Sequence, residues 1–374
     1  MQARPAPLFG IFDRMLLREL TWLFFSTLCG VVLLYLVIDF ADRAGSYGGP
    51  AWGKAVAQLY ANKAAVVTYQ LAPAALILSA ALLVASLSRR GELVALYALG
   101  LRPLRLALPV AAFALLAGCG LFLLNERLVV RADEAVDQIT LHRFHTWGDW
   151  GNYLIGSSWV RGREGRIFHL GPRGDDGAFA PATVLEIGAP FRLVRRIDAR
   201  RLEPAGPGQW RLVDAVETVY PKPTAQGPRM EEKRSAILIE PFPDTPDELS
   251  LRSGRPRQMR WGTLRSEAQR RERLGQPARE FRVALAERAA SPLQMVAAAL
   301  AALGLALWSG GGKRRERSLA QAFALGIGLT MALWSISVVA HAAAMAGSMP
   351  AWAAALLPSG LCVVCAAYTL ARAR

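Results

Sequence analysis

Six long apolar stretches constrain this chain more than any other feature. A helix needs about 20 consecutive apolar residues to cross the hydrocarbon core of a bilayer. Six stretches of the 374-residue chain approach or exceed that length with few or no charges. The composition agrees, because 53% of the residues are apolar and only 20% are charged, which is too hydrophobic for a soluble protein. We therefore predict an α-helical integral membrane protein with six spans: Leu20–Phe40, Ala64–Leu87, Leu104–Leu124, Ala289–Trp308, Leu319–Met345 and Ala351–Leu370.

The distribution of basic residues in the short loops predicts the orientation of these spans. Cytoplasmic loops of membrane proteins carry an excess of Lys and Arg. With a cytoplasmic N-terminus, the inner loops and termini hold thirteen basic residues, against three in the short outer loops. Both termini are therefore expected in the cytoplasm and residues 125–288 on the opposite side. The formal charge of +15 thus reflects membrane orientation, and no nucleic-acid partner is expected.

Residues 125–288 have the pattern of an inserted all-β domain with helical flanks. Short runs with alternating or β-branched character are separated by Gly and Pro clusters, which is typical of strands and turns. The flanks 126–144 and 264–287 are charged and rich in Ala, Glu, Arg and Leu, so we expect helical extensions of spans three and four, the second with a break at residues 275–277. The domains predicted are 1–124 with three spans, 125–288 with a β-sandwich or jelly-roll-like domain, and 289–374 with three spans. The expected strands are Asn152–Ile155, Arg166–Leu170, Thr183–Ile187, Phe191–Ala199, Trp210–Val213, Glu217–Tyr220 and Ala236–Glu240.

The loop between spans two and three is longer and more amphipathic than a linker requires. Residues 92–99 fit two helical turns, and Gly100 suits the left-handed position after a helix. One interpretation is a coupling helix, at about 91–100, that fits a groove on a cytoplasmic partner and offers the charge of Glu92. The other is an interfacial helix that lies on the lipid headgroups with nothing docked to it.

The sequence predicts neither a cofactor nor a metal site. No phosphate-binding loop of the form G-x-x-x-x-G-K-[ST] occurs, so the chain itself is not expected to hydrolyse ATP. His142, His145 and Asp149 match no zinc pattern. Cys362 and Cys365 lie on an apolar span, where we expect small buried hydrophobes. His341 stands alone in span five, and we expect a partner across the bundle or a position at headgroup level.

Acidic residues mark the outer end of the first span. Asp39, Asp42 and Arg43 lie together there, and a carboxylate at that depth is costly unless it is paired or faces water. Asp39 is therefore either turned inward or part of an ordinary interfacial cap in which Asp42 contacts Arg43.

Several of these motifs together resemble the permease subunits of the lipopolysaccharide-export ABC transporter, the LptF/LptG family. The resemblance covers essentially the whole chain: three spans, an extracytoplasmic domain, three spans. Its most specific part is Leu71-Ala72-Pro73 followed by residues 91–101, GELVALYALGL, which resemble the family's coupling-helix signature. Arg288, Pro292 and the basic turn 313–318 also fall at family positions. Residues 38–43 resemble the LptG side of the family more closely.

The resemblance implies a subunit of an inner-membrane transporter and not an enzyme. Two homologous permeases would pair with a dimer of a cytoplasmic ABC ATPase, which uses the ATP. Such a pair opens laterally between its first and fifth spans and takes up lipopolysaccharide, a membrane lipid. The lipid then passes through jelly-roll domains to a periplasmic bridge protein. The implied ATPase-coupling residues are Glu92, Leu93, Leu96, Tyr97 and Gly100.

Candidate residues for the substrate path lie at the outer end of span one and in the β domain. The family often places Lys or Arg near the outer end of span one, whereas this chain has Asp39 there and Arg43 as the nearest match. If the β domain hands an amphiphile along, we expect Ile187, Phe191, Leu193 and Val213 on its inner face and an open sheet edge. The alternative function is a membrane-anchored envelope scaffold or assembly factor that binds partners through this domain.

The predicted topology is tested by cysteine labelling. In a variant without the four native cysteines, an impermeant thiol reagent added from the periplasmic side should label Ser157→Cys and leave Ser318→Cys unlabelled until the membrane is permeabilised. The reason is the positive-inside bias. Labelling of Ser318→Cys from outside would overturn the topology.

Overall fold

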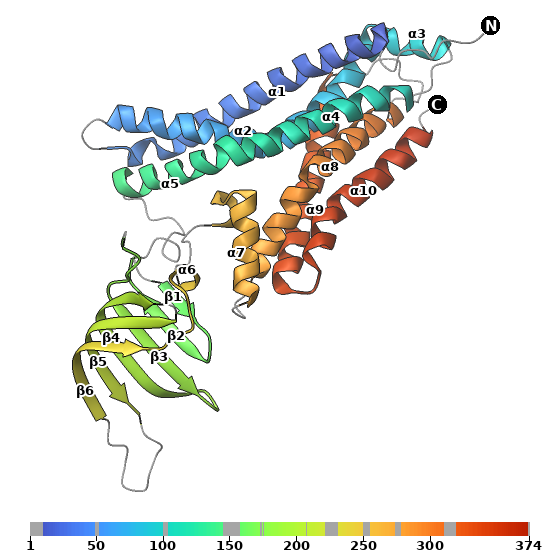
Figure 1. Cartoon of the computed structure of the whole chain (residues 1–374). Helices are drawn as coiled ribbons and strands as arrows, with labels where there is room; N and C mark the ends of the chain where they lie inside the picture. The colour runs from blue at the N-terminus through green and yellow to red at the C-terminus, as the bar shows by residue number, and fades with distance from the viewer. Residues whose placement is uncertain are drawn as a thin grey trace. The chain divides into compact units, whose positions relative to one another are not determined.

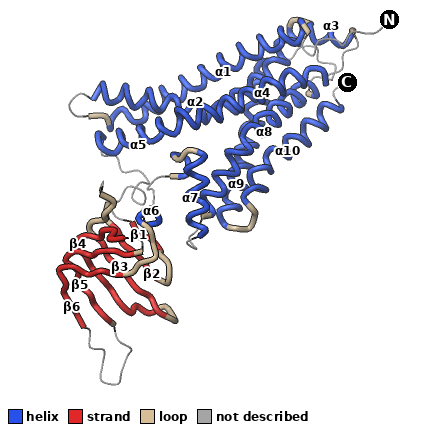
Figure 2. The backbone as a smooth tube through the Cα atoms, viewed as in Figure 1, coloured by secondary structure: helices blue, strands red, loops and turns tan. Residues whose placement is uncertain are grey.

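The structure is a computed structural model that falls into two compact units. It describes residues 10–48, 52–99, 104–144, 158–172, 174, 176–206, 208–220, 231–249, 255–273, 278–309 and 319–372. The membrane unit comprises Met1–Thr146, Pro256–Arg265 and Arg279–Arg374, and the β unit comprises Trp147–Arg255 and Ser266–Ala278. Figure 2 shows that the long helices belong to the first and all the strands to the second.

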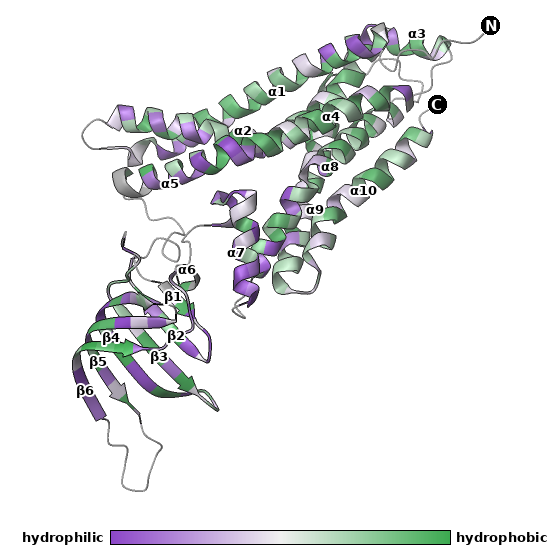
Figure 3. Ribbon diagram, in the orientation of Figure 1, coloured by the Kyte–Doolittle hydropathy of each residue, from purple (hydrophilic) through white to green (hydrophobic). Residues whose placement is uncertain are grey.

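The membrane unit contains six helices that are long and apolar enough to cross a bilayer, and they appear as long green stretches in Figure 3. Each of the six predicted spans lies inside one of them, which confirms the predicted fold class. They are α1 (Ile11–Arg43), α2 (Trp52–Arg89), α4 (Leu104–Leu124), α8 (Arg279–Trp308), α9 (Leu319–Ala346) and α10 (Ala351–Arg372). The shorter elements are η1 (Ala44–Ser46), α3 (Glu92–Ala98), α5 (Val130–Phe144) and η4 (Pro256–Gln258).

The helical flanks of the inserted domain differ from each other. A π-helix, η2 (Asn125–Val129), joins α4 to α5 without interruption, so the predicted extension of span three is confirmed. On the other side, α7 (Trp261–Arg273) ends before α8 begins at Arg279. The helical character predicted for residues 264–287 is confirmed for the described residues, which belong to α7 and to the start of α8. The break expected at residues 275–277 lies outside the described residues.

Two helices form the centre of the membrane unit. In the apolar windows of α2 and α8, 67% and 61% of the residues are buried, against 17% in those of α1 and α9. Small residues allow the close packing: a Cβ on Gly118 of α4 would lie 2.8 Å from the Pro292 Cα of α8, and one on Gly326 of α9 would lie 2.6 Å from the Leu78 side chain of α2. Helices α1, α2 and α4 run side by side (Figure 1). The outward faces of α1 and α9 remain apolar and uncovered.

The described strands of the β unit form one curved, antiparallel sheet (Figure 1). The order β1-β2-β3-β4-β5-β6 follows the chain, so the described strands form a meander and not the two facing sheets of a sandwich. Asn152–Ile155 lies outside the described residues, β1 was not anticipated, and the two runs expected around residues 210 and 220 are one strand, β5. The strands are β1 (Ser158–Arg161), β2 (Arg166–Leu170), β3 (Ala182–Gly188), β4 (Arg192–Gly206), β5 (Gln209–Val219) and β6 (Glu231–Glu240), followed by the short helix α6 (Pro246–Leu249).

One face of this sheet carries the apolar core. Phe168 pairs with Val184, and Val184 with Ile197, so these three fully buried side chains form one row on the same face. Trp210, 1% exposed, donates a hydrogen bond from its indole nitrogen to the Asp244 carbonyl at 2.8 Å. Phe242 packs edge-on against Phe168. The segment after β6 therefore closes over the inner face and supplies part of the core.

Beyond the apolar row, the same face carries an ion network centred on Arg195. Arg195 lies two residues from Ile197 on β4, and its guanidinium is 2.6 Å from both Glu217 and Glu240. Arg166 reaches Glu186 at 3.2 Å. The hydrogen bond to Glu240 raises the pKa of Arg195 above its ordinary value, against the opposing effect of burial. The inner face thus holds packed apolar side chains at one end and paired charges at the other.

The register corrects the expected lining of the inner face. Ile187 lies on the face opposite Val184, because successive residues of a strand alternate between faces; it pairs with Leu193 just beyond the register shift that follows Glu186. Val213 pairs with Ile237, which is 61% exposed. Phe191 is 84% exposed in the β3–β4 turn, where its φ is +83°. The hydrophobic character of these residues was sufficient to predict strands, but not to predict which face of the sheet each side chain occupies.

Trp210 and Trp159 provide a matched test of this core. Trp210→Ala should lower the unfolding free energy of the β unit by about 3–5 kcal/mol, since it removes a buried side chain and its hydrogen bond. Trp159→Ala should have a small effect, because Trp159 is 60% exposed. The measurement is protease resistance of the β unit in the full-length protein as temperature rises. Equal losses for the two variants would contradict the assigned faces.

Candidate functional site

Helix α3 follows directly on α2 through a single sharp turn. Gly91 adopts the left-handed conformation with φ of +73°, which glycine enters without a Cβ penalty. The Arg90 and Gly91 amides still bond back to the last turns of α2. Leu93 is buried in the apolar core of the membrane unit and Leu96 packs against it. This contact fixes α3 to the helical bundle.

Three apolar side chains of α3 and of the residue that follows it are exposed. Leu99 is 77% exposed and Val94 63% exposed, and Tyr97 is exposed beside them. Exposed apolar residues gathered on one short helix mark an interaction surface. We call Val94, Tyr97 and Leu99 the α3 patch.

Glu92 lies at the start of α3 with its charge only partly compensated. Its carboxylate is 3.8 Å from Arg90, whose guanidinium also reaches Glu19 at 3.1 Å. The second carboxylate oxygen of Glu92 is buried, and no described group donates a hydrogen bond to it. A buried acceptor without a donor is costly, so this oxygen favours a further hydrogen-bond donor beside it.

At the other end of α1, Asp39 is turned inward and fully paired. Its side chain is 10% exposed, and it contacts the Lys63 ammonium and lies 3.2 Å from Arg43. Tyr60 donates to it at 2.8 Å. Of the two interpretations of Asp39, the inward one holds, and Arg43 pairs with Asp39. Asp39 is therefore shared between two cations of the chain, Lys63 and Arg43.

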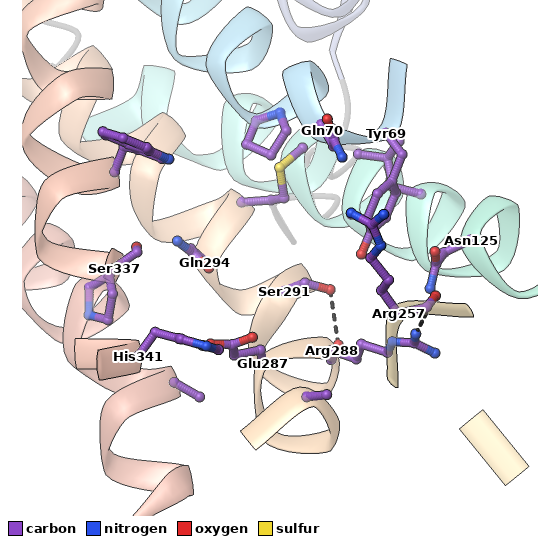
Figure 4. A pocket seen from close by; sticks show the side chains of 18 of the residues that line it. Tyr69, Gln70, Asn125, Arg257, Glu287, Arg288, Ser291, Gln294, Ser337 and His341 are labelled. Atoms are coloured by element: carbon purple, nitrogen blue, oxygen red, sulfur yellow. Dashed lines mark hydrogen bonds and ion pairs between the residues drawn. The ribbon is translucent and has the colours of Figure 1, made fainter. Parts of the chain in front are cut away.

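A cavity of about 550 Å³ lies within the membrane unit (Figure 4). Helices α2, α8, α9 and α10 line it, together with the α4–α5 segment. Its apolar walls include Pro73, Met295 and Trp334, while Asn125, Gln70 and Gln294 contribute amides. The cavity has the size and mixed lining of a ligand site.

Arg288 forms one wall of this cavity and fixes the segment that leads back from the β unit. Its side chain is 9% exposed and donates to the main-chain carbonyls of Pro256, Arg257 and Met259 at 2.5–2.9 Å. Glu126 lies 3.4 Å from the guanidinium and accepts the Trp261 amide at 2.8 Å. Among the described residues, Arg288 thus joins α8 to η4 and to the π-helix η2.

The remaining charged groups of the cavity are also paired. Glu287 of α8 contacts His341 of α9 at 2.7 Å, which confirms the expectation of a partner for His341 across the bundle. Asp133 lies 3.1 Å from Arg257. Two cations, Arg257 and Arg288, and two carboxylates, Asp133 and Glu287, line the cavity, so its lining has no net charge when His341 is neutral.

Comparison with known proteins decides the family. The model of the lipopolysaccharide export system permease LptF/LptG matches residues 14–372, nearly the whole chain. The chain belongs to the LptF/LptG permease family. No curated protein matches its sequence. Membership and the six apolar helices make the chain a multi-pass inner-membrane permease of a lipopolysaccharide transport system.

The residues predicted for the permease's function divide into three groups. Glu92 and Tyr97 are partly or largely exposed, while Leu93 and Leu96 pack against the permease's own core. Gly100 lies outside the described residues, as do His145, Asp149 and the basic turn 313–318. Val94 and Leu99 were not predicted from the sequence; helical spacing places Val94 about 100° around the axis from Leu93, whereas Leu99 follows the last residue of α3.

The cavity was missed as well, because its residues come from helices far apart in the chain. The signals available were the polar residues Asn125, Gln70 and Gln294 beside or within apolar spans. Such residues are costly in a membrane and usually face the interior of a bundle.

Arg288 provides the test of how the permease is held together. Arg288→Ala should destabilise the detergent-solubilised protein by about 3–5 kcal/mol, because three main-chain carbonyls would lose their donor and half-buried Glu126 would lose its cation. The measurement is the free energy of unfolding by denaturant. The matched control is Arg131→Ala on α5, an exposed arginine, which should change it by under about 0.5 kcal/mol. An equally small change for Arg288→Ala would show that the bonds from Arg288 to Glu126 and to the three carbonyls are not needed for stability.

Proposed function

We propose that this permease is one of two homologous subunits of an ABC transporter that extracts lipopolysaccharide from the inner membrane and passes it to a periplasmic bridge protein. The observation that carries the proposal is the family match over residues 14–372. Hydrolysis of ATP belongs, in this proposal, to a cytoplasmic ATPase dimer, and the chain itself binds no cofactor. The proposed topology has both termini in the cytoplasm and the β unit in the periplasm.

The α3 patch supports the ATPase partnership. Three apolar side chains give a docking surface, while Leu93 anchors the helix so that a push on the patch is transmitted to α2. A basic residue in a groove of the partner would pair with the carboxylate of Glu92, whose side chain is 34% exposed. The apolar contact of the α3 patch and the charge of Glu92 together hold α3 in one orientation on the ATPase. A fixed orientation is required if ATP hydrolysis is to move the helices.

The exposed faces of α1 and α9 support a second permease. Trp22 and Phe25 of α1 and Trp334 and Val339 of α9 are 60–71% exposed. Lipid alone would accommodate such faces, but these are the two helices between which permeases of this family open laterally. We propose that they meet the corresponding helices of the second permease, and that Asp39 with Arg43 lies beside the opening.

The packing of the β unit favours the alternative function, a membrane-anchored scaffold. The inner face of the β unit is filled by Trp210, Phe242 and the Arg195 ion network, so a lipid path along it requires these side chains to move. A β unit that binds only other envelope proteins fits this packing without movement. In the proposed function, therefore, the membrane unit moves the lipid and the β unit contacts the bridge protein.

Charge reversal at Glu92 tests ATPase docking. Glu92→Lys should reduce the ATPase that co-purifies with the permease pair at least ten-fold, because it replaces an attraction by a repulsion beside a cation; loss of one partner of a buried pair costs about 3–5 kcal/mol. Glu92→Gln should have a smaller effect. Reversing the charge of the contacting residue on the ATPase should restore part of the binding to Glu92→Lys.

The matched control is Glu134→Lys on α5, an exposed carboxylate far along the chain from α3, which should co-purify the ATPase normally. A second variant, Leu99→Asp, places a charge in the α3 patch and should also release the ATPase. Normal ATPase co-purification with both Glu92→Lys and Leu99→Asp would return α3 to the interpretation of a helix that only lies on the membrane.

A further inference from the structure

Two arginines flank helix α3 along the chain, and both pair with carboxylates of α1, whose first turns lie beside α3 (Figure 1). Arg90 precedes α3, and its guanidinium is 3.1 Å from the Glu19 carboxylate. Arg105 lies in the first turn of α4 and donates to Asp13 at 2.7 Å. Asp13 and Glu19 lie within two turns of each other on α1. Both ends of the connection that contains α3 are therefore fastened to one short part of α1.

In each pair, the carboxylate of α1 is shielded from water more than its arginine. The Asp13 side chain is 1% exposed and that of Glu19 is 13% exposed, whereas Arg90 is 56% exposed. Glu19 also accepts a hydrogen bond from the Ser86 hydroxyl of α2 at 2.6 Å. A shielded carboxylate with two donors keeps one orientation, because each bond constrains its direction. Glu19 thus holds the last turns of α2 and the start of α3 at one position against α1.

The remaining contacts of α1 are less specific. Leu16, Leu20, Phe24 and Leu28 form one apolar stripe that packs in the core, but only 17% of the apolar window of α1 is buried. Apolar contact is not directional, so such a stripe allows a helix to slide or turn. The Asp13 pair alone would leave α1 free to rotate about a single point. The Glu19 pair supplies a second point, and two points make α1 follow the segment that contains α3.

Arg90 also connects this contact to the ATPase-facing charge of α3. Its guanidinium lies between Glu19 and the Glu92 carboxylate, which is 3.8 Å away. In the proposed function, a basic residue of the ATPase pairs with Glu92. That residue would repel Arg90 from Glu92 and so favour the contact of Arg90 with Glu19. Docking of the partner would therefore strengthen the hold of α3 on α1.

We propose that Glu19 is a positioning residue, which acts through Arg90 and makes α1 follow the ATP-driven movement of α3. This inference rests on the proposed function, in which α1 borders the lateral opening, and it names the residue through which the movement reaches that helix. The α3 patch and Leu93 do not contact Glu19, so the ATPase would dock without it. Loss of Glu19 separates hydrolysis from helix movement.

The test compares lipid release with ATP hydrolysis in vesicles that contain the full-length chain, the homologous permease and the ATPase, with the soluble bridge protein as acceptor. Glu19→Gln should co-purify the ATPase normally and hydrolyse ATP, yet release about five-fold less lipopolysaccharide per ATP, the lower end of typical coupling between sites. Arg90→Gln should have a similar effect. The double variant should be no worse than either single variant, because both act through one contact. Glu19→Asp, which keeps the charge, should restore part of the release.

The matched control is Arg18→Gln, which removes an exposed charge from the same turn of α1. Arg18 has no partner among the described residues, so release per ATP should stay unchanged. Glu19→Gln should also unfold at nearly the same temperature as the unaltered protein, because the arginine of the pair is largely exposed.

Three results would overturn the inference: unchanged release per ATP in Glu19→Gln, losses that add in the double variant, or a loss that is accompanied by a much lower unfolding temperature. The last would assign Glu19 to folding alone. Absence of ATP-dependent release from vesicles with the unaltered chain would instead contradict the proposed function itself.

Discussion

Charged side chains beside hydrocarbon must be paired, and the membrane unit of this permease is organised around that requirement. At one end of the bundle, Asp13 is fully buried and lies 2.7 Å from Arg105, which ties α1 to α4. At the other end, Asp39 with Lys63 ties α1 to α2. Arg288 and Glu126 tie α8 to the α4–α5 segment. Apolar contact alone would allow these helices to slide along one another, because it is not directional. Each ion pair requires one geometry and therefore fixes the relative position of the two helices that it connects.

The spans could be predicted from the sequence because length and composition suffice to define them, whereas the partners of the polar residues could not. Lys63 is 24 residues from Asp39 and Glu126 is 162 residues from Arg288, and nothing local indicates either pairing. In the β unit, the strands were largely recognised but their faces were not. A shift of one residue moves a side chain to the other face, and the register shift between β3 and β4 lies next to Ile187. In α3, composition alone does not distinguish buried Leu93 from exposed Val94, whereas helical spacing places the two on different sides of the helix.

The polar groups of this permease fall into two kinds, those with and those without a partner among the described residues. Those bonded within the chain, such as Arg288 and Asp39, hold the structure and are poorly available to a substrate. The Glu92 oxygen and the Asn125 amide have no hydrogen-bond partner among the described residues. The first lies on a short helix with an exposed apolar patch, which suits a protein, and the second in a cavity with an apolar wall, which suits a lipid.

The central claim is that this chain moves lipopolysaccharide as a permease subunit. The most direct measurement is ATP-dependent release of lipopolysaccharide from vesicles that contain the chain, its homologous permease and the ATPase, with the soluble bridge protein as acceptor. The account predicts release that requires ATP and falls to background when this chain is omitted. Undiminished release without it, from vesicles otherwise identical, would contradict the account and favour the scaffold.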